Sequence, residues 1–449
     1  MTEPSQILTP DVLSRRGFLK NSTVMAGGAL LGSLAAERFA HAASGTAEIK
    51  IALIGCGGRG SGAAGQALST YAQGPVKLVA MADVHEDRLK GALGNLEKSH
   101  GARVDVPPDR QFLGFEAFQK AIALCDVAIL STPPGFRPMM FEEAIKQGKN
   151  VFMEKPVASD AAGVRKVIAA AEEAKKKNLK VGVGLQRRHQ AGYLETIKRL
   201  HDGQIGDITS MRAFWNGSRP WQKKRADLEK QYGRPLTEME YQLRNWYYFA
   251  WICGDHIAEQ HIHNLDVINW VKNGPPVKAR GMGGREIAST SDDGDIYDHF
   301  ACQFEYADGS ICFSECRHQA NTWSSVSEHA VGTKGRVDIG GYKILGSDPW
   351  RYKSEGPNKD PYQQEHDDLF DAIRNNKDFN EAFYGASSTM TSILGRMAAY
   401  SGKELEYTAA LNSKIELLPK ELGWDKPAPV NPGANGLYPR AIPGKTQVI

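Results

Sequence analysis

The chain has 449 residues, of which 41% are hydrophobic and 24% are charged, and its formal net charge at pH 7 is +3. This composition is that of an ordinary soluble globular protein, and the length suggests two domains. So small a net charge gives no reason to expect binding to nucleic acid or to an anionic membrane surface.

The first 43 residues resemble a twin-arginine export signal. Residues 14–20 read Ser-Arg-Arg-Gly-Phe-Leu-Lys and match the pattern Ser-Arg-Arg-x-Phe-Leu-Lys at every fixed position. A mildly apolar stretch follows at 24–36, and Ala-His-Ala-Ala at 40–43 supplies small residues for cleavage. The apolar stretch is too short and too rich in glycine and alanine for a stable membrane span. We therefore expect residues 1–43 to be removed and the protein to be exported to the periplasm.

Six cysteines lie in the rest of the chain, and no two of them form a Cys-x-x-Cys pair. A zinc ribbon or a thioredoxin-type site is therefore not expected. We expect all six to be reduced and structural, although export to an oxidising compartment leaves a disulfide open.

A glycine-rich turn follows the first predicted strand, residues 49–54. Residues 55–60 fit Gly-x-Gly-x-x-Gly, and a helix is predicted to follow at 61–71. Glycines in such a turn let a pyrophosphate approach the backbone, and the helix N-terminus offers free amides to its phosphates. A second predicted strand, 76–82, is followed by an acid at the position that binds the adenosine ribose. The sequence thus predicts a dinucleotide site that includes Gly55, Gly57, Gly58, Arg59, Gly60 and Asp83.

The acid at the end of the second strand bears on the choice of cofactor. Asp83 would repel a 2′-phosphate, so NAD is favoured over NADP. Arg59 and Arg88 are close enough in sequence to soften that preference, so NADP stays open.

Strands and helices then alternate as far as residue 185. Strands are predicted at 127–131, 150–153 and 181–184, and helices at 115–124, 136–147 and 164–177. This alternation predicts an α/β fold in which residues 47–185 form a Rossmann domain with a doubly wound parallel sheet. Thr132 and Pro133 follow a strand end, at the carboxyl edge of the sheet where ligands bind.

Glu154-Lys155-Pro156 follows the strand at 150–153 and completes a recognisable order of motifs. The glycine turn, the acid after the second strand, Thr-Pro after the fourth and then Glu-Lys-Pro resemble the Gfo/Idh/MocA oxidoreductases. These include the glucose–fructose oxidoreductases and the inositol dehydrogenases. The resemblance implies a cofactor contact at Glu154, a proline often preceded by a cis bond, and a Lys155 that points to the nicotinamide and the substrate.

Residues 186–430 are predicted to form a second, α+β domain. Its first helix, from 186 to about 200, includes Gln186, Arg187 and Tyr193, which the resemblance places near cofactor and substrate; a charged helix start is the alternative. Strands predicted at 208–215, 277–283, 297–306, 310–318, 325–332 and 336–339 suggest a mostly antiparallel open sheet. One face would carry helices, including those at 366–374 and 387–400. The other would be free for contact with a second copy, so a homo-oligomer is expected. Residues 431–449 read as an irregular tail that wraps the surface or a neighbouring subunit.

The segment 216–251 is polar and rich in aromatic residues, and it is too long for a simple connection. Its aromatic side chains, among them Trp246, could stack on the apolar face of a sugar ring. They could equally form an oligomer contact, because aromatic residues are enriched at interfaces.

The stretch 254–270 carries the catalytic candidates. Glu259, His263 and Asp266 are spaced i, i+4 and i+7, which would place them on one face of a single helix. The family pattern is Asp-x-x-x-His-x-x-Asp, and here Glu259 replaces the first acid. The resemblance implies that His263 carries a proton, with Lys155 as its catalytic partner and Glu259 as a helper. Asp266 would brace the fold.

Two further readings concern the same stretch. His256 could contact the substrate, although an exposed role is the alternative. The histidines do not form His-Glu-x-x-His, and hydride chemistry needs no metal, so no metal site is expected.

These features predict an enzyme that transfers a hydride between NAD(P) and a secondary alcohol of a sugar or polyol. Export then suggests a tightly bound cofactor that returns to its starting state in each turnover, because free NAD is not expected outside the cytoplasm. An NAD-dependent glycosidase that works by transient oxidation and elimination is one alternative. A non-catalytic sugar-binding protein on the same fold is another.

Overall fold

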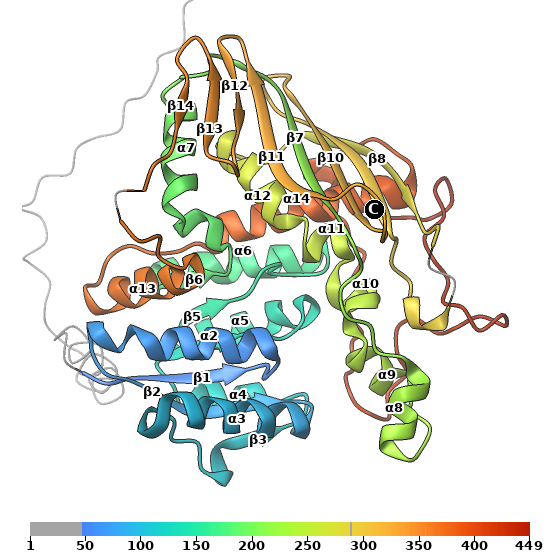
Figure 1. The fold of residues 1–449 in the computed structure, drawn as a ribbon. Helices are drawn as coiled ribbons and strands as arrows, with labels where there is room; N and C mark the ends of the chain where they lie inside the picture. The colour runs from blue at the N-terminus through green and yellow to red at the C-terminus, as the bar shows by residue number, and fades with distance from the viewer. Residues whose placement is uncertain (1–46, 288–289, 355) are drawn as a thin grey trace, which may run out of the picture.

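The computed structural model describes residues 47–287, 290–354 and 356–449. The expected export signal, residues 1–43, lies outside this range. Two sheets dominate the described part of the chain, one made by its first half and one by its second (Figure 1).

The first sheet is parallel and has the strand order β3-β2-β1-β4-β5-β6, which is that of a Rossmann fold. Its central strand β4 (Val127–Leu130) is apolar along its whole length because helices cover both faces of the sheet. The strands are β1 (Ile49–Ile54), β2 (Val76–Asp83), β3 (Gln111–Leu113), β4 (Val127–Leu130), β5 (Asn150–Met153) and β6 (Val181–Val183). The helices are α2 (Gly58–Ser69), α3 (Glu86–His100), α4 (Ala117–Ala123), α5 (Arg137–Lys146) and α6 (Ala161–Lys176).

The second sheet has nine strands in the order β14-β13-β12-β11-β7-β10-β9-β8-β15. Only the pair β7–β10 is parallel, so the sheet is mixed and mostly antiparallel, which confirms the predicted fold class. The strands are β7 (Ile208–Gly217), β8 (Lys278–Gly284), β9 (His299–Glu305), β10 (Ile311–His318), β11 (Ser325–Gly332), β12 (Gly335–Asp338), β13 (Lys343–Gly346), β14 (Trp350–Arg351) and β15 (Leu405–Glu406).

Helices lie between the two sheets and bury one face of the second (Figure 1). α11 (His256–Glu259), α12 (Ile262–Val271) and α14 (Ala382–Ser401) contact the strands of this sheet. β10 alternates buried and more exposed residues, as a strand with one covered face should. The uncovered face exposes Met282, Phe313 and Val331. α7 (Ala191–His201) joins the two domains, and α15 (Tyr407–Leu411) follows β15.

α13 (Pro361–Arg374) comes late in the chain but packs on the Rossmann domain beside α2. Leu369 and Phe370 are fully buried there in the same apolar cluster as Ile51 and Leu53. The segment after α13 also pairs with the last strand of the sheet, because Val181 donates its amide to the carbonyl of Phe379 at 3.0 Å.

Several elements differ from the sequence-based predictions. The stretch 254–270 is not one helix, because it breaks between α11 and α12. The segment 216–251 is not a loop: it forms α8 (Arg225–Tyr232), α9 (Glu238–Arg244) and α10 (Ala250–Cys253), and we call residues 218–253 the arm. The helix predicted at 61–71 begins earlier, at Gly58, inside the glycine turn. Sequence reasoning missed α3 and the strands β3, β13, β14 and β15. All six cysteines are buried and unpaired.

The third glycine of the turn sets how closely α2 can approach β1. A Cβ on Gly60 would lie 2.0 Å from the carbonyl oxygen of Gly55. We predict that Gly60→Ala lowers the free energy of unfolding by about 1–3 kcal/mol, because backbone must move to admit the methyl group. Thermal or denaturant unfolding of the variant measures this.

Gly91→Ala is the matched control. Gly91 lies exposed in α3, and a Cβ there meets no atom within 4 Å. The same substitution should therefore leave stability unchanged or raise it by about 0.5–1 kcal/mol. Equal stability of the Gly60 variant and the native protein would contradict the argument.

Candidate active site

A cavity of about 750 Å³ lies along the carboxyl edge of the parallel sheet, where Rossmann folds bind their ligands. The Rossmann domain lines it with the glycine turn, Asp83, Thr132, Pro133, Glu154 and Lys155. The opposite wall comes from α11 and α12 and from the arm. It includes Glu259, Gln260, His263, Trp221, Trp246 and Tyr247.

The glycine turn is shaped for an anionic ligand. A Cβ on Gly57 or Gly58 would meet no atom within 4 Å, so the backbone here faces open space. α2 begins at Gly58, and no side chain caps it. The amides of its first turn are therefore available to phosphates, and the helix dipole favours negative charge there. The residues present fit a bound dinucleotide.

Asp83 lies at the adenosine end of this cavity, at the end of β2. Its carboxylate accepts hydrogen bonds from the amides of Cys56, at 2.6 Å, and His85, at 2.8 Å. It thus links the glycine turn to the segment after β2. Burial raises its pKa, and the two amide bonds oppose that rise.

Arg59 connects the turn to distant parts of the chain. Its Nε lies 2.5 Å from Oε1 of Glu154, and its second amino nitrogen lies 3.0 Å from Glu365 of α13. β5, which Glu154 follows, and β2, which Asp83 ends, lie on opposite sides of β1. Arg59 is therefore turned away from the adenosine ribose position, whereas Arg88 lines the cavity near Asp83.

Lys155, Glu259 and His263 meet at the other end of the cavity. The Lys155 amine donates to the backbone carbonyl of Glu259 and lies 3.1 Å from its Oε1. The peptide bond between Lys155 and Pro156 is cis, as the resemblance implied. The His263 ring stacks on Trp215, with 5.9 Å between the ring centroids.

His263 is held as a neutral base. Burial, followed by the positive charges of Lys155 and Arg187, lowers its pKa well below the ordinary value of 6.5. Its Nδ1 is buried and has no protein partner in the described part of the chain. A neutral imidazole in this position can accept a proton from a ligand in the cavity.

Four predicted site residues do not line the cavity. Arg187 forms an ion pair with the fully buried Glu328 of β11, and Tyr193 donates to the same carboxylate at 3.1 Å. Gln186 donates to the hydroxyl of Tyr362, which does line the cavity, at 3.1 Å. His256 is fully buried and stacks on His318. His318 in turn contacts Gln260, so His256 lies a layer behind the wall.

Sequence reasoning missed Arg137 and Gln260, which line the cavity. Arg137 is 4% exposed and donates to the carbonyl of Pro156, which steadies the segment that carries Lys155. Burial lowers its pKa to about 10, so it stays a cation at neutral pH. Arg137 could have been identified from the sequence, because it lies four residues after Pro133, at the carboxyl edge of the sheet. Nothing in the sequence indicated Gln260, because it reaches the cavity only through the break between α11 and α12.

The described residues contain no group of three or more histidine, cysteine, aspartate or glutamate side chains placed to hold a metal ion. Within the same part of the chain, no helix combines the length and the apolar character needed to cross a membrane.

Two family models match the chain. One describes an oxidoreductase family with an NAD-binding Rossmann fold (GFO/IDH/MocA) and matches residues 49–183. The other describes the GFO/IDH/MocA C-terminal domain and matches residues 193–338. Together they cover more than half of the chain, and the first identifies the nucleotide site as one of the NAD-binding type.

The chain is also similar to individual proteins. It is 29% identical over 217 residues to inositol 2-dehydrogenase of Agrobacterium fabrum, which covers 48% of this chain and 52% of that protein. The chain spans between 32% and 59% of the length of the curated relatives that it matches here.

Solved structures share the fold over most of the chain. Aldose–aldose oxidoreductase from Caulobacter crescentus superposes with a TM-score of 0.62 and 18% identity, covering 80% of this chain and all of that one. Scyllo-inositol dehydrogenase from Lactobacillus casei, bound to NAD(H) and scyllo-inositol, gives a TM-score of 0.57 and 19% identity, covering 81% and 100%.

Asp266 lies on α12 but turns away from the cavity. It is 1% exposed and pairs with Arg188 through contacts of 2.8 and 2.9 Å. We predict that Asp266→Asn lowers the free energy of unfolding by about 3 kcal/mol, because it leaves a largely buried guanidinium without its counter-charge. Urea denaturation measures the loss.

The exposed pair Lys198–Asp202 of α7 provides the control. Asp202→Asn should not change the denaturation midpoint measurably, because water screens both charges. A similar, small effect of both substitutions would show that Asp266 does not brace the fold.

Proposed function

Because the chain belongs to the GFO/IDH/MocA family of oxidoreductases, we propose that it transfers a hydride between NAD and a secondary alcohol of a sugar or polyol. The observation that carries the proposal is the meeting of Lys155, Glu259 and His263 at the end of a dinucleotide-shaped cavity. The glycine turn and Asp83 would hold the cofactor, which supplies the hydride acceptor.

Oxidation of an alcohol requires a group that takes the hydroxyl proton while hydride leaves carbon. His263 is neutral and lines the cavity, so it takes this role. Lys155 stabilises the negative charge that develops on the oxygen. Glu259 fixes the lysine by accepting from it twice, through its carbonyl and its carboxylate. Trp221, Trp246 and Tyr247 offer apolar faces to the sugar ring.

A redox-neutral version of this chemistry is the second candidate, and the placement of the Glu259 carboxylate beside His263 in the cavity wall favours it. His263 and Glu259 share one wall of the cavity, whereas simple dehydrogenation needs only one base. Elimination of a glycosidic substituent would use a second group, Glu259, for proton transfer. Denatured protein should then release NAD(H) in stoichiometric amount, and aryl glycosides should release their aryl group without added NAD. Turnover only with added NAD would identify an ordinary dehydrogenase.

We further propose that residues 1–43 direct twin-arginine export to the periplasm and that the protein forms a homo-oligomer. The Arg15-Arg16 motif supports the export proposal, and replacing both residues by lysine should retain the protein in the cytoplasm.

The uncovered face of the second sheet supports the proposal of a homo-oligomer, because Met282 is 74% exposed and Phe313 is 43% exposed. Sedimentation of Phe313→Glu against the native protein tests it.

We predict that His263→Ala and Lys155→Ala each lower kcat by about 10²–10⁴-fold, because each removes a group that moves or stabilises charge in the reaction. Turnover of a panel of sugars and inositols measures this. Lys198→Ala, an exposed lysine of α7, is the control and should keep full activity. Unchanged activity in both cavity variants, with unfolding midpoints equal to that of the native protein, would overturn the assignment.

The lowered pKa of His263 sets the expected pH dependence. A base with a lowered pKa stays unprotonated as pH falls through 6.5 and loses function only below that value. We therefore predict that kcat/KM for alcohol oxidation is constant from about pH 8 to pH 6.5 and falls only in more acidic solution. If half of the activity is already lost at or above pH 6.5, the base is not a buried, neutral His263.

A further inference from the structure

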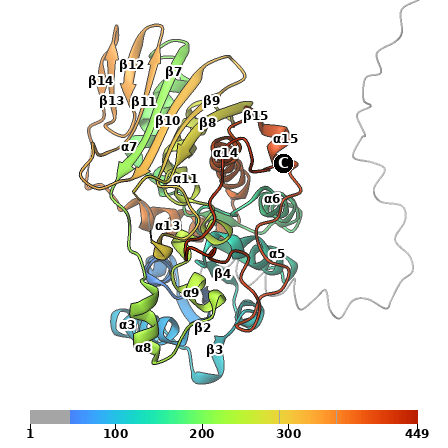
Figure 2. The ribbon, with the colours of Figure 1, turned by 90° about the vertical axis from the view of Figure 1, so that its right-hand side faces the viewer.

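Residues 412–449, which we call the strap, cross the molecule as an irregular segment that is fixed at both ends. At its start, Arg165 of α6 donates to the carbonyl of Ser413 at 2.8 Å, and Leu417 donates to Asp160 at 2.7 Å. Near its end, the amide of Gly444 donates to the carbonyl of Ser401 in α14 at 2.8 Å. The dark red trace of Figure 2 shows the strap leaving α15, descending past α5 and returning to the C-terminus.

The middle of the strap lies over the adenosine end of the cavity. Leu422 is part of the cavity wall. Trp424 packs from outside against two other wall residues, with ring centroids 5.6 Å from His85 and 5.0 Å from Phe115. His85 follows β2 two residues after Asp83, the acid that marks the ribose position. The strap thus covers the part of the site where adenosine belongs.

The arm covers the same end from another side. Arg244, at the end of α9, makes two contacts with Asp87 of α3, at 2.6 and 2.9 Å. This pair ties the arm to the Rossmann domain. Lys223 and Leu243 of the arm line the cavity, so both covering segments reach the ligand space.

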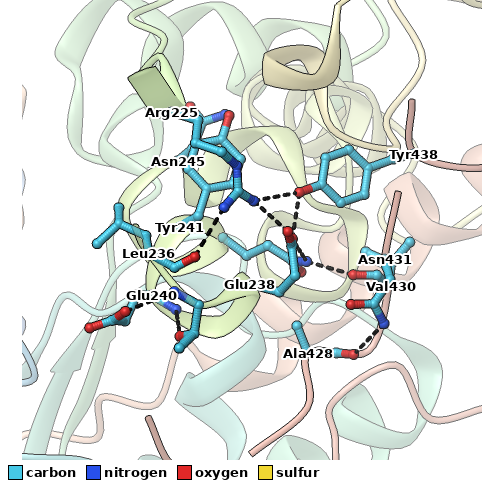
Figure 3. Close-up of polar contacts among 12 residues, drawn as sticks. Arg225, Leu236, Glu238, Glu240, Tyr241, Asn245, Ala428, Val430, Asn431 and Tyr438 are labelled. Atoms are coloured by element: carbon cyan, nitrogen blue, oxygen red, sulfur yellow. Dashed lines mark hydrogen bonds and ion pairs between the residues drawn. The ribbon is translucent and has the colours of Figure 1, made fainter. Parts of the chain in front are cut away.

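Strap and arm are joined to each other by a partly buried polar cluster (Figure 3). Arg225 of α8 lies 2.5 Å from Glu238 of α9, and the hydroxyl of Tyr438 donates to the same carboxylate at 2.6 Å. Gln242 donates to the carbonyl of Val430 at 2.6 Å. Near the cavity, Thr237 donates to the carbonyl of Trp424 at 3.4 Å. These hydrogen bonds tie the strap to the arm.

We propose that the strap and the arm form a clasp that retains the adenine dinucleotide, with Leu422 as part of its binding wall and Trp424 as the latch. The inference rests on the proposed use of NAD. A cofactor enclosed at its adenosine end leaves only when Trp424 comes away from His85 and Phe115. Contacts of this kind slow dissociation far more than they change association. The clasp lies wholly within one chain and uses residues outside the Rossmann domain.

The test measures NADH dissociation from the full-length protein, by displacing fluorescent NADH with excess NAD in a stopped-flow instrument. Trp424→Ala should release NADH at least about tenfold faster than the native protein, because the latch loses two aromatic contacts. Tyr438→Phe keeps the ring on Phe249 and removes only the hydroxyl link, so a smaller acceleration is expected. Trp323→Ala, an exposed tryptophan at the far sheet, is the control and should not change the rate.

A second readout follows the strap itself. NADH should protect the strap of the native protein from limited proteolysis and should protect that of Trp424→Ala less. Equal dissociation rates in the native protein and both clasp variants would overturn the clasp and leave the proposed function standing. No NADH binding by the native protein would overturn the proposed function and the clasp with it. Faster release in a protein that turns over no sugar would support the clasp and count against the function.

Discussion

The structure of the active site depends on the guanidinium of Arg59, which lies between Glu154 and Glu365. Both carboxylates are almost fully buried, and burial together with the neighbouring Glu154 raises the pKa of Glu365 well above its ordinary value. Two carboxylates so close would repel each other without a shared cation. Arg59 therefore holds three segments in one arrangement: the glycine turn, the Glu-Lys-Pro segment and α13. Because Lys155 is the next residue after Glu154, this ion cluster also fixes the backbone position of Lys155. The lysine side chain extends from there across the cavity to Glu259.

The same matching of charges extends around the reactive end. Lys155 is paired with Glu259, Arg187 with Glu328 and Arg188 with Asp266. Arg137 has no such contact, but Glu154 and Glu259 lie near enough to raise its pKa against the effect of burial. Each of these cations is thus balanced by a carboxylate of the protein. Under the proposed function, a reactive end in which Lys155 is paired with Glu259 and His263 is neutral would suit an uncharged polyol better than a phosphorylated or carboxylated one.

The sequence was sufficient for most of the Rossmann half, apart from α3 and β3, because its signals are local. Apolar strands such as residues 150–153 and the glycine turn specify their structure without distant partners. The break between α11 and α12 could not be predicted in this way. The break lies at Gln260 and His261, after the short helix α11, whose N-cap is Asp255. Asp255 has a positive φ and accepts hydrogen bonds from Tyr297 and Tyr400, which are far away in sequence. Glu259 and His263 were expected to lie together on one face of a single helix. They do lie together, but on two short helices. They share the cavity wall, but Asp266, which the single helix would have placed beside them, turns to Arg188.

An irregular tail was expected at residues 431–449, but the positions of the arm and the strap were beyond sequence reasoning, since they depend on pairs such as Arg244–Asp87 and Trp424–His85. Their position has a consequence for the kind of reaction that the site can sustain. A redox-neutral cycle needs the cofactor to stay bound through two half-reactions, so dissociation must be slower than a turnover of typically about 10 s⁻¹. Under the proposed function, the Rossmann domain would hold the dinucleotide, and the strap and the arm would cover its adenosine end. Segments that close that end lower the rate of release without touching the reacting atoms. Under the proposed function, Lys155, Glu259 and His263 lie at the other end, and substrates would exchange there while the cofactor stays.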